Sequence, residues 1–208
     1  MVLAGIIISY LIGSIPTAYI LGRILKGIDI RKFGSGNVGA TNAFRLLGPI
    51  WGVVVLVLDI LKGIIPVTVL ADYFLNNWAY SGIILRMLFG LTCVCGHNWT
   101  LFLRFKGGKG VATTLGVLAG LAMVVNELRL VLFLVILVWL IAFLIFRIVS
   151  VASVLSALAL PLFTLILHRS KELLVLSIIF CIFIILRHKR NLLGLFSKKE
   201  RPLSFRGR

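Results

Sequence analysis

The chain has 208 residues, of which 61% are hydrophobic and only 13% are charged. Charged residues make up roughly a quarter of a soluble domain, so this composition excludes an ordinary soluble globule and indicates an integral membrane protein. The formal net charge of +16 does not by itself indicate nucleic-acid binding, because excess Lys and Arg mark the cytoplasmic loops of membrane proteins and attract anionic lipid headgroups. We therefore expect membrane lipids, and no nucleic acid, as partners.

Apolar runs between polar breaks predict an all-α bundle of seven transmembrane helices in a single domain over residues 1–191. The first run is interpreted as a retained span, because it lacks the basic leader and small-residue cleavage pattern of a secretory signal. Residues 192–208 are expected to form a basic C-terminal tail on the membrane surface. The predicted helices cover residues 2–22, 49–71, 82–98, 110–126, 129–146, 149–167 and 172–187.

The placement of Lys and Arg predicts the orientation of these spans. Of the 22 basic residues, 17 fall in one alternate set of loops and the C-terminal segment, three fall in the opposite loops, and Lys62 and Arg86 lie inside spans. We therefore expect the N-terminus outside, the C-terminus in the cytoplasm, and the three most polar segments of the chain on the cytoplasmic side.

The first polar segment, residues 34–42, reads GSGNVGATN. Closely spaced glycines let successive backbone N–H groups point into one concavity, as in phosphate-binding loops. Side-chain donors in the segment and Arg45 beyond it add hydrogen bonds and charge. The alternative is a flexible connector rich in turn-forming residues. We favour an anion site, because the donors outnumber those that a turn requires.

The second polar segment, residues 106–110, reads KGGKG and precedes the fourth predicted helix. It is not a nucleotide-binding P-loop, because it lacks the earlier glycine and the Ser or Thr after the second lysine. Two lysines on a glycine hinge at a helix N-terminus are typical of a site for a phosphate monoester. The alternative, a loop that is basic only because it faces the cytoplasm, is about equally supported.

The third polar segment ends the seventh predicted helix. Arg187, Lys189 and Arg190 fit a membrane stop signal, but His188 and Asn191 do not. These two lie three positions apart and so share one helical face. Since histidine can donate to a phosphate or exchange a proton near neutral pH, we interpret the pair as functional.

Other polar residues in the spans are interpreted as structural. Cys93, Cys95 and His97 supply too few converging ligands for a closed zinc site, so we expect buried thiols and no metal. Residues 96–98, Gly-His-Asn, are interpreted as a hydrogen-bonding scaffold. Asp59 and Lys62 can neutralise each other one helical turn apart within the second span.

Several motifs, and their order along the chain, resemble those of the bacterial acyl-phosphate:glycerol-3-phosphate acyltransferase family, PlsY. These motifs are residues 35–42, 58–63, 96–98, 105–113, 147–150 and 187–191. The resemblance implies a seven-helix enzyme of the bacterial inner membrane with its active site facing the cytoplasm. Such enzymes transfer a fatty acyl group from acyl phosphate to the 1-hydroxyl of glycerol 3-phosphate, giving lysophosphatidic acid and inorganic phosphate for phospholipid synthesis. The resemblance implies no metal and no organic cofactor.

With these substrates, individual residues receive expected roles. Ser35 and His188 are the candidate catalytic residues; the proton acceptor is His188 or a substrate phosphate, and both direct transfer and an acyl-Ser35 intermediate stay open. The residues expected to bind acyl phosphate are Ser35, Gly36, Asn37, Gly39, Thr41 and Asn42. Those expected to bind glycerol 3-phosphate are Arg45, Lys106, Gly107, Gly108, Lys109, Ser150, His188 and Asn191.

A transporter of phosphate-bearing anions or of lysophospholipid is the alternative function. Asp59, Lys62 and Arg86 would then line a pathway through the membrane. The enzyme is favoured, because the polar loops are predicted on one side and no inverted repeat is visible. A monomer would suffice for the predicted site, and the oligomeric state is left open.

Overall fold

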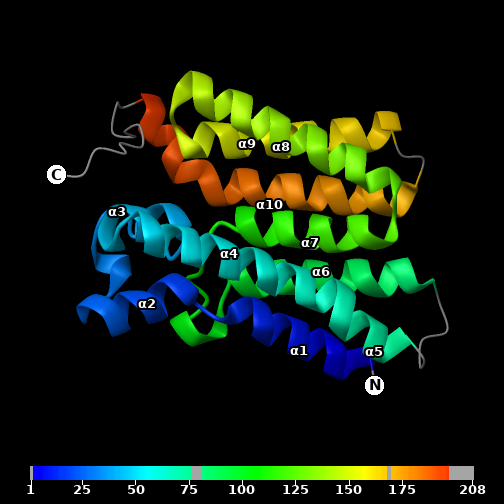
Figure 1. Ribbon diagram of the computed structural model, residues 1–208, viewed down its shortest axis with the longest axis horizontal. Coiled ribbons are helices and arrows are strands. Elements are labelled where there is room, and N and C mark those ends of the chain that lie inside the picture. Colours follow the sequence, from blue (N-terminus) through cyan, green and yellow to red (C-terminus); the bar gives the residue numbers. More distant parts are fainter. Residues whose placement is uncertain (1, 76–80, 168–169, 197–208) are drawn as a thin grey trace. The chain divides into compact units, whose positions relative to one another are not determined.

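The computed structural model describes residues 2–75, 81–167 and 170–196, and every regular element within these ranges is helical. The prediction of an all-helical protein is therefore confirmed (Figure 1). The chain divides into two compact units, Met1–Val124 and Val125–Arg208, and each is described by itself. Compact packing does not decide whether residues 1–191 fold as one domain, so that expectation stays a prediction.

The predicted first span consists of two helices. Helix α1 covers Val2–Ser14 and α2 covers Thr17–Lys26, with a bend of 40° at the break between them. Pro16 lies at this break, and proline has no N–H to continue the helical hydrogen-bond ladder. The sequence reading overlooked this interruption because the residues on both sides are apolar.

The rest of the first unit contains an unexpected α-helix in the glycine-rich region, besides short helical turns that were also not predicted. The α-helix is α3, Ala40–Leu47, preceded by the short 3₁₀ turn η1, Ile30–Lys32. The predicted second span is longer than expected and contains a π-helical turn, η2. The remaining elements are α4 (Pro49–Ile65), η2 (Pro66–Leu70), α5 (Ala71–Leu75), α6 (Gly82–Asn98), η3 (Leu101–Leu103) and α7 (Val111–Val124).

Glycines set the helix packing of the first unit. Helix α1 packs on α6, and α4 packs on α7. A side chain at Gly13 would collide with the backbone of Cys93, and one at Gly63 with the backbone of Thr113. Small residues at such contacts let membrane helices approach closely. In Figure 1, α2 and α3 lie at one end of this unit and α5 at the other.

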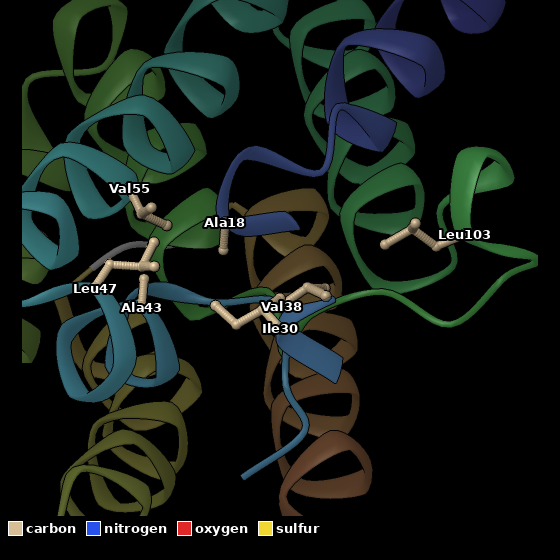
Figure 2. Packing of buried hydrophobic residues seen from close by; sticks show 7 residues of the cluster. All are labelled: Ala18, Ile30, Val38, Ala43, Leu47, Val55 and Leu103. Carbon is tan, nitrogen blue, oxygen red and sulfur yellow. The ribbon is translucent and has the colours of Figure 1, made fainter. Parts of the chain in front are cut away.

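A buried apolar cluster packs the first unit together at the end where α2 and α3 lie. Figure 2 shows Val38 beside Ile30, and Leu47 grouped with Ala43 and Val55. Val38 belongs to the glycine-rich segment, and Leu103 of the same cluster shortly precedes the KGGKG segment. The cluster therefore anchors both polar segments at one end of the first unit. Its buried members are Ala18, Ile30, Val38, Ala43, Leu47, Val55 and Leu103.

The described part of the second unit consists of three helices. They are α8 (Glu127–Phe146), α9 (Val149–Leu167) and α10 (Lys171–Phe196). Helix α9 packs against both of the others, and its bounds match the prediction. Helix α10 continues nine residues past its predicted end at residue 187, so residues 192–196 of the predicted tail are helical. Residues 197–208 of that tail lie outside the described residues.

Three helices of the described chain are long and apolar enough to cross a membrane, namely Pro49–Leu75, Glu127–Phe146 and Val149–Leu167. The bent pair α1–α2 makes a fourth if it counts as one span, and α7 is apolar but shorter. These helices support a multi-pass membrane protein. The count of seven spans and the orientation of the termini stay predictions.

Candidate active site

The glycine-rich segment forms the loop between η1 and α3. Gly34 (φ 59°) and Gly36 (φ 69°) adopt the left-handed backbone conformation, which glycine tolerates without the steric penalty of a side chain. Gly39 is the residue before the first turn of α3. The loop therefore leads into a helix N-terminus, where unpaired N–H groups and the helix dipole favour anions.

The side chain of Asn42 holds this loop in shape. It is 1% exposed, and its Oδ1 accepts a hydrogen bond from the Ser35 N–H at 3.0 Å. Its Nδ2 lies within hydrogen-bonding distance of three carbonyl oxygens, those of Ile30 at 3.1 Å, Phe33 at 3.3 Å and Asn37 at 2.9 Å. An amide has only two hydrogens to share among these acceptors. In this conformation Asn42 therefore serves the loop and has no donor left for a substrate.

Three other side chains of this region have hydrogen-bond donors that the fold of the loop does not use. The Ser35 hydroxyl, the Asn37 amide and the Thr41 hydroxyl make no hydrogen bond to any described residue. Ser35 is exposed, and Asn37 and Thr41 are half-buried. Arg45 lies one helical turn after Thr41 on α3, with its side chain exposed. The start of α3 thus presents several uncommitted donors and one nearby guanidinium.

The second polar segment folds back onto the end of α6. The N–H groups of Gly107 and Gly108 donate to the carbonyl oxygens of Asn98 and His97 at 3.2 and 3.0 Å. Gly108 lies so close to the His97 ring that a side chain there would collide with Nε2. The carbonyl oxygens of His97 and Asn98 thus act as the predicted scaffold, whereas the side-chain amide of Asn98 has no partner in the described part of the protein. The two hydrogen bonds hold the backbone on the N-terminal side of Lys109, which is half-buried just before α7.

A buried ion pair is linked to this scaffold. Lys62 and Asp59 of α4, 7% and 1% exposed, lie 2.7 Å apart. Thr17 donates to Asp59 at 2.7 Å, and Lys62 also donates to the carbonyl oxygen of Ile15 at 3.1 Å. The His97 Nδ1 lies 3.9 Å from Asp59. The pair therefore joins α2 and α4 to the part of α6 on which the KGGKG segment rests.

Replacing Asp59 with Asn is expected to destabilise the protein by about 3–5 kcal/mol, because it leaves the Lys62 ammonium buried without a counter-charge. The measurement is the thermal unfolding temperature of the detergent-purified protein. Asp59→Leu combined with Lys62→Met should recover much of the loss, since it removes both buried charges. Glu127→Gln, at the start of α8, is the control; an Asp59→Asn protein as stable as this control would contradict the prediction.

Buried polar atoms without partners among the described residues occur at the end of α6 and in the first turn of α7. Both polar atoms of the Asn98 amide and the hydroxyls of Thr113 and Thr114 are buried and have no hydrogen-bond partner in the described part of the protein. A side chain at Gly110 would contact the Asn98 amide. Buried polar groups are normally paired, so these atoms are candidate contacts beside Lys109. Sequence reasoning missed the two threonines because they occur inside an apolar run.

A hollow of about 340 Å³, here called the basic hollow, lies between η1 and the turn at η3. Arg31 donates from Nε and Nη2 to the two carboxylate oxygens of Asp29, at 2.9 and 2.7 Å. These hydrogen bonds lower the pKa of Asp29 to about 2, so the carboxylate stays ionised at neutral pH. Lys106 is the predicted site residue that lines the hollow. The lining residues are Tyr19, Arg31, Phe102, Leu103, Arg104 and Lys106.

The remaining predicted site residues belong to the second unit. Ser150 is buried in the first turn of α9. His188 is buried in α10, with its Nδ1 2.8 Å from the carbonyl oxygen of Ile184. The tautomer that carries its hydrogen on Nδ1 donates to this carbonyl oxygen. Asn191 follows three positions later on α10 and so lies on the same helical face. The predicted site residues therefore fall into two groups, one in each unit.

The apolar helices define a multi-pass membrane protein, and its two glycine-rich loops each lead into a helix N-terminus. The family model described as glycerol-3-phosphate acyltransferase matches residues 3–198. This chain belongs to that family.

Individual relatives agree with this membership. A glycerol-3-phosphate acyltransferase of Fusobacterium nucleatum subsp. nucleatum is 40% identical over 200 residues, which cover 96% of this chain and 97% of that relative. The glycerol-3-phosphate acyltransferase 2 of Moorella thermoacetica is 52% identical over 120 residues, and that match spans 58% of each chain.

Two crystal structures of PlsY, described as an integral membrane glycerol 3-phosphate acyltransferase, share the fold. The glycerol 3-phosphate form has a TM-score of 0.85 and 38% identity, over 98% of this chain and 96% of that one. The lysophosphatidic acid form has a TM-score of 0.82 and 37% identity over the same shares. The resemblance inferred from the sequence motifs is thereby confirmed.

Proposed function

We propose that this protein acylates glycerol 3-phosphate as a step of membrane phospholipid synthesis. The observation that carries this function is the match, over 96% of this chain and 97% of the relative, to a glycerol-3-phosphate acyltransferase. The fatty acyl donor is an acyl phosphate, and the products are lysophosphatidic acid and inorganic phosphate. The two phosphate-bearing substrates account for two separate glycine-rich segments, each of which leads into a helix N-terminus.

The loop before α3 binds the phosphate of the acyl donor. Ser35, Asn37 and Thr41 are suited to this role because their side-chain donors have no partner among the described residues. Gly36 and Gly39 let the backbone approach the phosphate closely. Asn42 acts as a positioning residue, through the hydrogen bonds that shape the loop.

The residues proposed to bind glycerol 3-phosphate include two well-suited cations. Arg45 offers a planar guanidinium for bidentate contact with phosphate, and Lys109 offers a point charge. Lys106 is the weaker candidate because its side chain lines the basic hollow. The remaining proposed contacts are Ser150, His188 and Asn191. Gly107 and Gly108, expected from the sequence to bind the substrate, use their N–H groups on α6 and so act by positioning Lys109.

The reaction needs positioning more than activation, because an acyl phosphate already carries a good leaving group. The 1-hydroxyl oxygen of glycerol 3-phosphate attacks the acyl carbonyl carbon and forms the ester bond, while the bond from that carbon to the phosphate oxygen breaks. The hydroxyl proton passes to His188 or to a phosphate oxygen. Loop N–H groups and cations neutralise the charge that develops. An acyl-Ser35 intermediate is the alternative route.

The proposed location is the bacterial inner membrane, with seven spans, the N-terminus outside and the site facing the cytoplasm. The excess of Lys and Arg in the loops that carry the polar segments supports this orientation. Transport, the alternative function, loses support from the structure. Asp59 and Lys62 are engaged with each other, and Arg86 donates to the carbonyl oxygen of Val67 at 2.6 Å, so these groups are structural contacts.

The test is phosphate release by the purified protein in detergent, with glycerol 3-phosphate and palmitoyl phosphate. We expect phosphate and lysophosphatidic acid in equal amounts, dependent on both substrates, and no turnover of palmitoyl-CoA as a control donor. Turnover of the CoA ester alone would keep the acyltransfer and overturn the donor. No conversion by folded protein with either donor, together with uptake into sealed proteoliposomes, would favour transport.

A further inference from the structure

We propose that the basic hollow binds the phosphate of an anionic phospholipid headgroup from the surrounding bilayer, in addition to the two substrates of the reaction. The hollow is lined by three cations, Arg31, Arg104 and Lys106. None of the loop residues assigned to acyl phosphate lines it. Lys106 is also the weaker candidate for glycerol 3-phosphate, but Arg31 and Arg104 have no role in the proposed acyltransfer.

The charges in the hollow are incompletely neutralised. The side chains of Arg104 and Lys106 are exposed and make no hydrogen bond or ion pair with the described residues. Arg31 uses Nε and Nη2 for Asp29, which leaves the hydrogens of Nη1 outside that pair. A phosphate group would supply the missing negative charge, and both guanidinium and ammonium groups bind phosphate.

Arg31 is held in place before any ligand arrives. Its guanidinium carbon lies 5.1 Å from the centre of the Tyr19 ring, and that of Arg23 lies 5.4 Å from the same ring. Arg23 also donates to the Tyr19 hydroxyl at 3.2 Å. The bidentate pair with Asp29 and the cation–π contact restrict the Arg31 side chain, so little of its conformational freedom remains to be lost on binding.

Exposed apolar side chains at and just after η3 favour a lipid over free phosphate as the ligand of the basic hollow. Phe102 and Phe105 are each 57% exposed and Leu101 is 50% exposed, beside the cations of the hollow. Arg104 (φ 55°) and Phe105 (φ 60°) both adopt the left-handed conformation, which is uncommon for residues with a side chain. Exposed apolar groups next to Lys and Arg are typical of segments at the boundary between headgroups and acyl chains. A soluble phosphate would not use them.

The test is lipid retention by the purified protein, measured by native mass spectrometry with phosphatidylglycerol and phosphatidylcholine of matched acyl chains. We expect preferential retention of phosphatidylglycerol. Arg104→Gln should lower that retention about fivefold, since each basic residue near an anionic lipid contributes about this factor, and leave phosphatidylcholine unchanged. Lys106→Gln should act alike, and it provides the test if Arg104→Gln does not fold. Lys32→Gln removes an exposed charge of η1 outside the hollow and should retain lipid like the unmodified protein.

Three results would overturn the proposal. One is equal retention of the two lipids by the unmodified protein. Another is an equal loss of phosphatidylglycerol in Lys32→Gln and Arg104→Gln, which would assign the effect to overall charge. The third is displacement of phosphatidylglycerol by millimolar inorganic phosphate, which would assign the hollow to a soluble anion. Acyltransfer is measured separately, so each of these results would leave the proposed reaction standing.

Discussion

Replacing Asn42 with Ala is expected to lower kcat by about a hundredfold, the size of loss that a displacement of about 1 Å in a positioned group produces. The buried Asn42 amide accepts a hydrogen bond from the Ser35 N–H and donates to the carbonyl oxygens of Ile30 and Asn37. Its removal leaves these groups unpaired, at about 0.5–1.5 kcal/mol for each lost hydrogen bond. The loop would then no longer hold the acyl phosphate in one orientation. The measurement is steady-state phosphate release, accompanied by the thermal unfolding temperature.

Asn37→Ala is the matched control, because the side chain of Asn37 contributes no hydrogen bond to the loop and only its carbonyl oxygen is used. It should weaken the use of acyl phosphate without lowering the unfolding temperature, whereas Asn42→Ala should lower both. Asn42→Asp keeps the acceptor for the Ser35 N–H and should retain part of the stability, while its negative charge repels the donor phosphate. A wild-type kcat in Asn42→Ala would rule out the positioning role.

Replacing Lys109 or Arg45 with Ala is expected to raise the KM for glycerol 3-phosphate by about 10- to 150-fold, with a smaller change in kcat. That range corresponds to about 1.5–3 kcal/mol for one hydrogen bond to a charged group. Both residues are proposed to bind the phosphate of the acceptor, which does not change during the reaction. Their contribution should therefore be similar in the bound state and in the transition state.

Conservative variants separate charge from geometry at these two positions. Arg45→Lys should keep less of the affinity than Lys109→Arg, because an ammonium cannot reproduce the bidentate contact of a guanidinium. Lys32→Ala removes a neighbouring exposed charge and controls for electrostatic attraction of the substrate. If the KM for glycerol 3-phosphate is unchanged in both Lys109→Ala and Arg45→Ala, the phosphate of the acceptor is bound elsewhere.

Hydropathy predicted the apolar helices well, because membrane burial depends directly on composition. It predicted the bounds of α9 correctly and missed α3, an eight-residue helix inside a segment dominated by glycine and polar residues. The end of α10 was also wrong. Arg187, Lys189 and Arg190 are good helix formers, so the helix continues after the apolar run has ended. Polarity marks where a helix leaves hydrocarbon, which is a different position from where the helix stops.

The sequence predicted which residue types belong to the candidate site, but it predicted their individual roles less completely. Ser35 and Thr41 were identified as donors, and the structure leaves both hydroxyls without a partner among the described residues. Asn42 was grouped with them, yet its amide is used to fold the loop. A sequence shows that an asparagine is present but not which backbone groups lie within its reach. The sequence also did not predict the basic hollow. Its lining residues come from segments far apart in the chain, such as Arg31 of η1 and Arg104 about 70 positions later.

The Asp59–Lys62 pair also bears on how the chain enters the bilayer during synthesis. A single charge at the centre of a span raises the cost of insertion by about 2.5–3.5 kcal/mol. The two residues lie three positions apart on α4 with their charged atoms 2.7 Å from each other, so this span can enter as a neutral unit. Its partition into lipid then does not depend on a neighbouring helix arriving at the same moment. The contacts with Thr17 and His97 can form afterwards, when the helices associate.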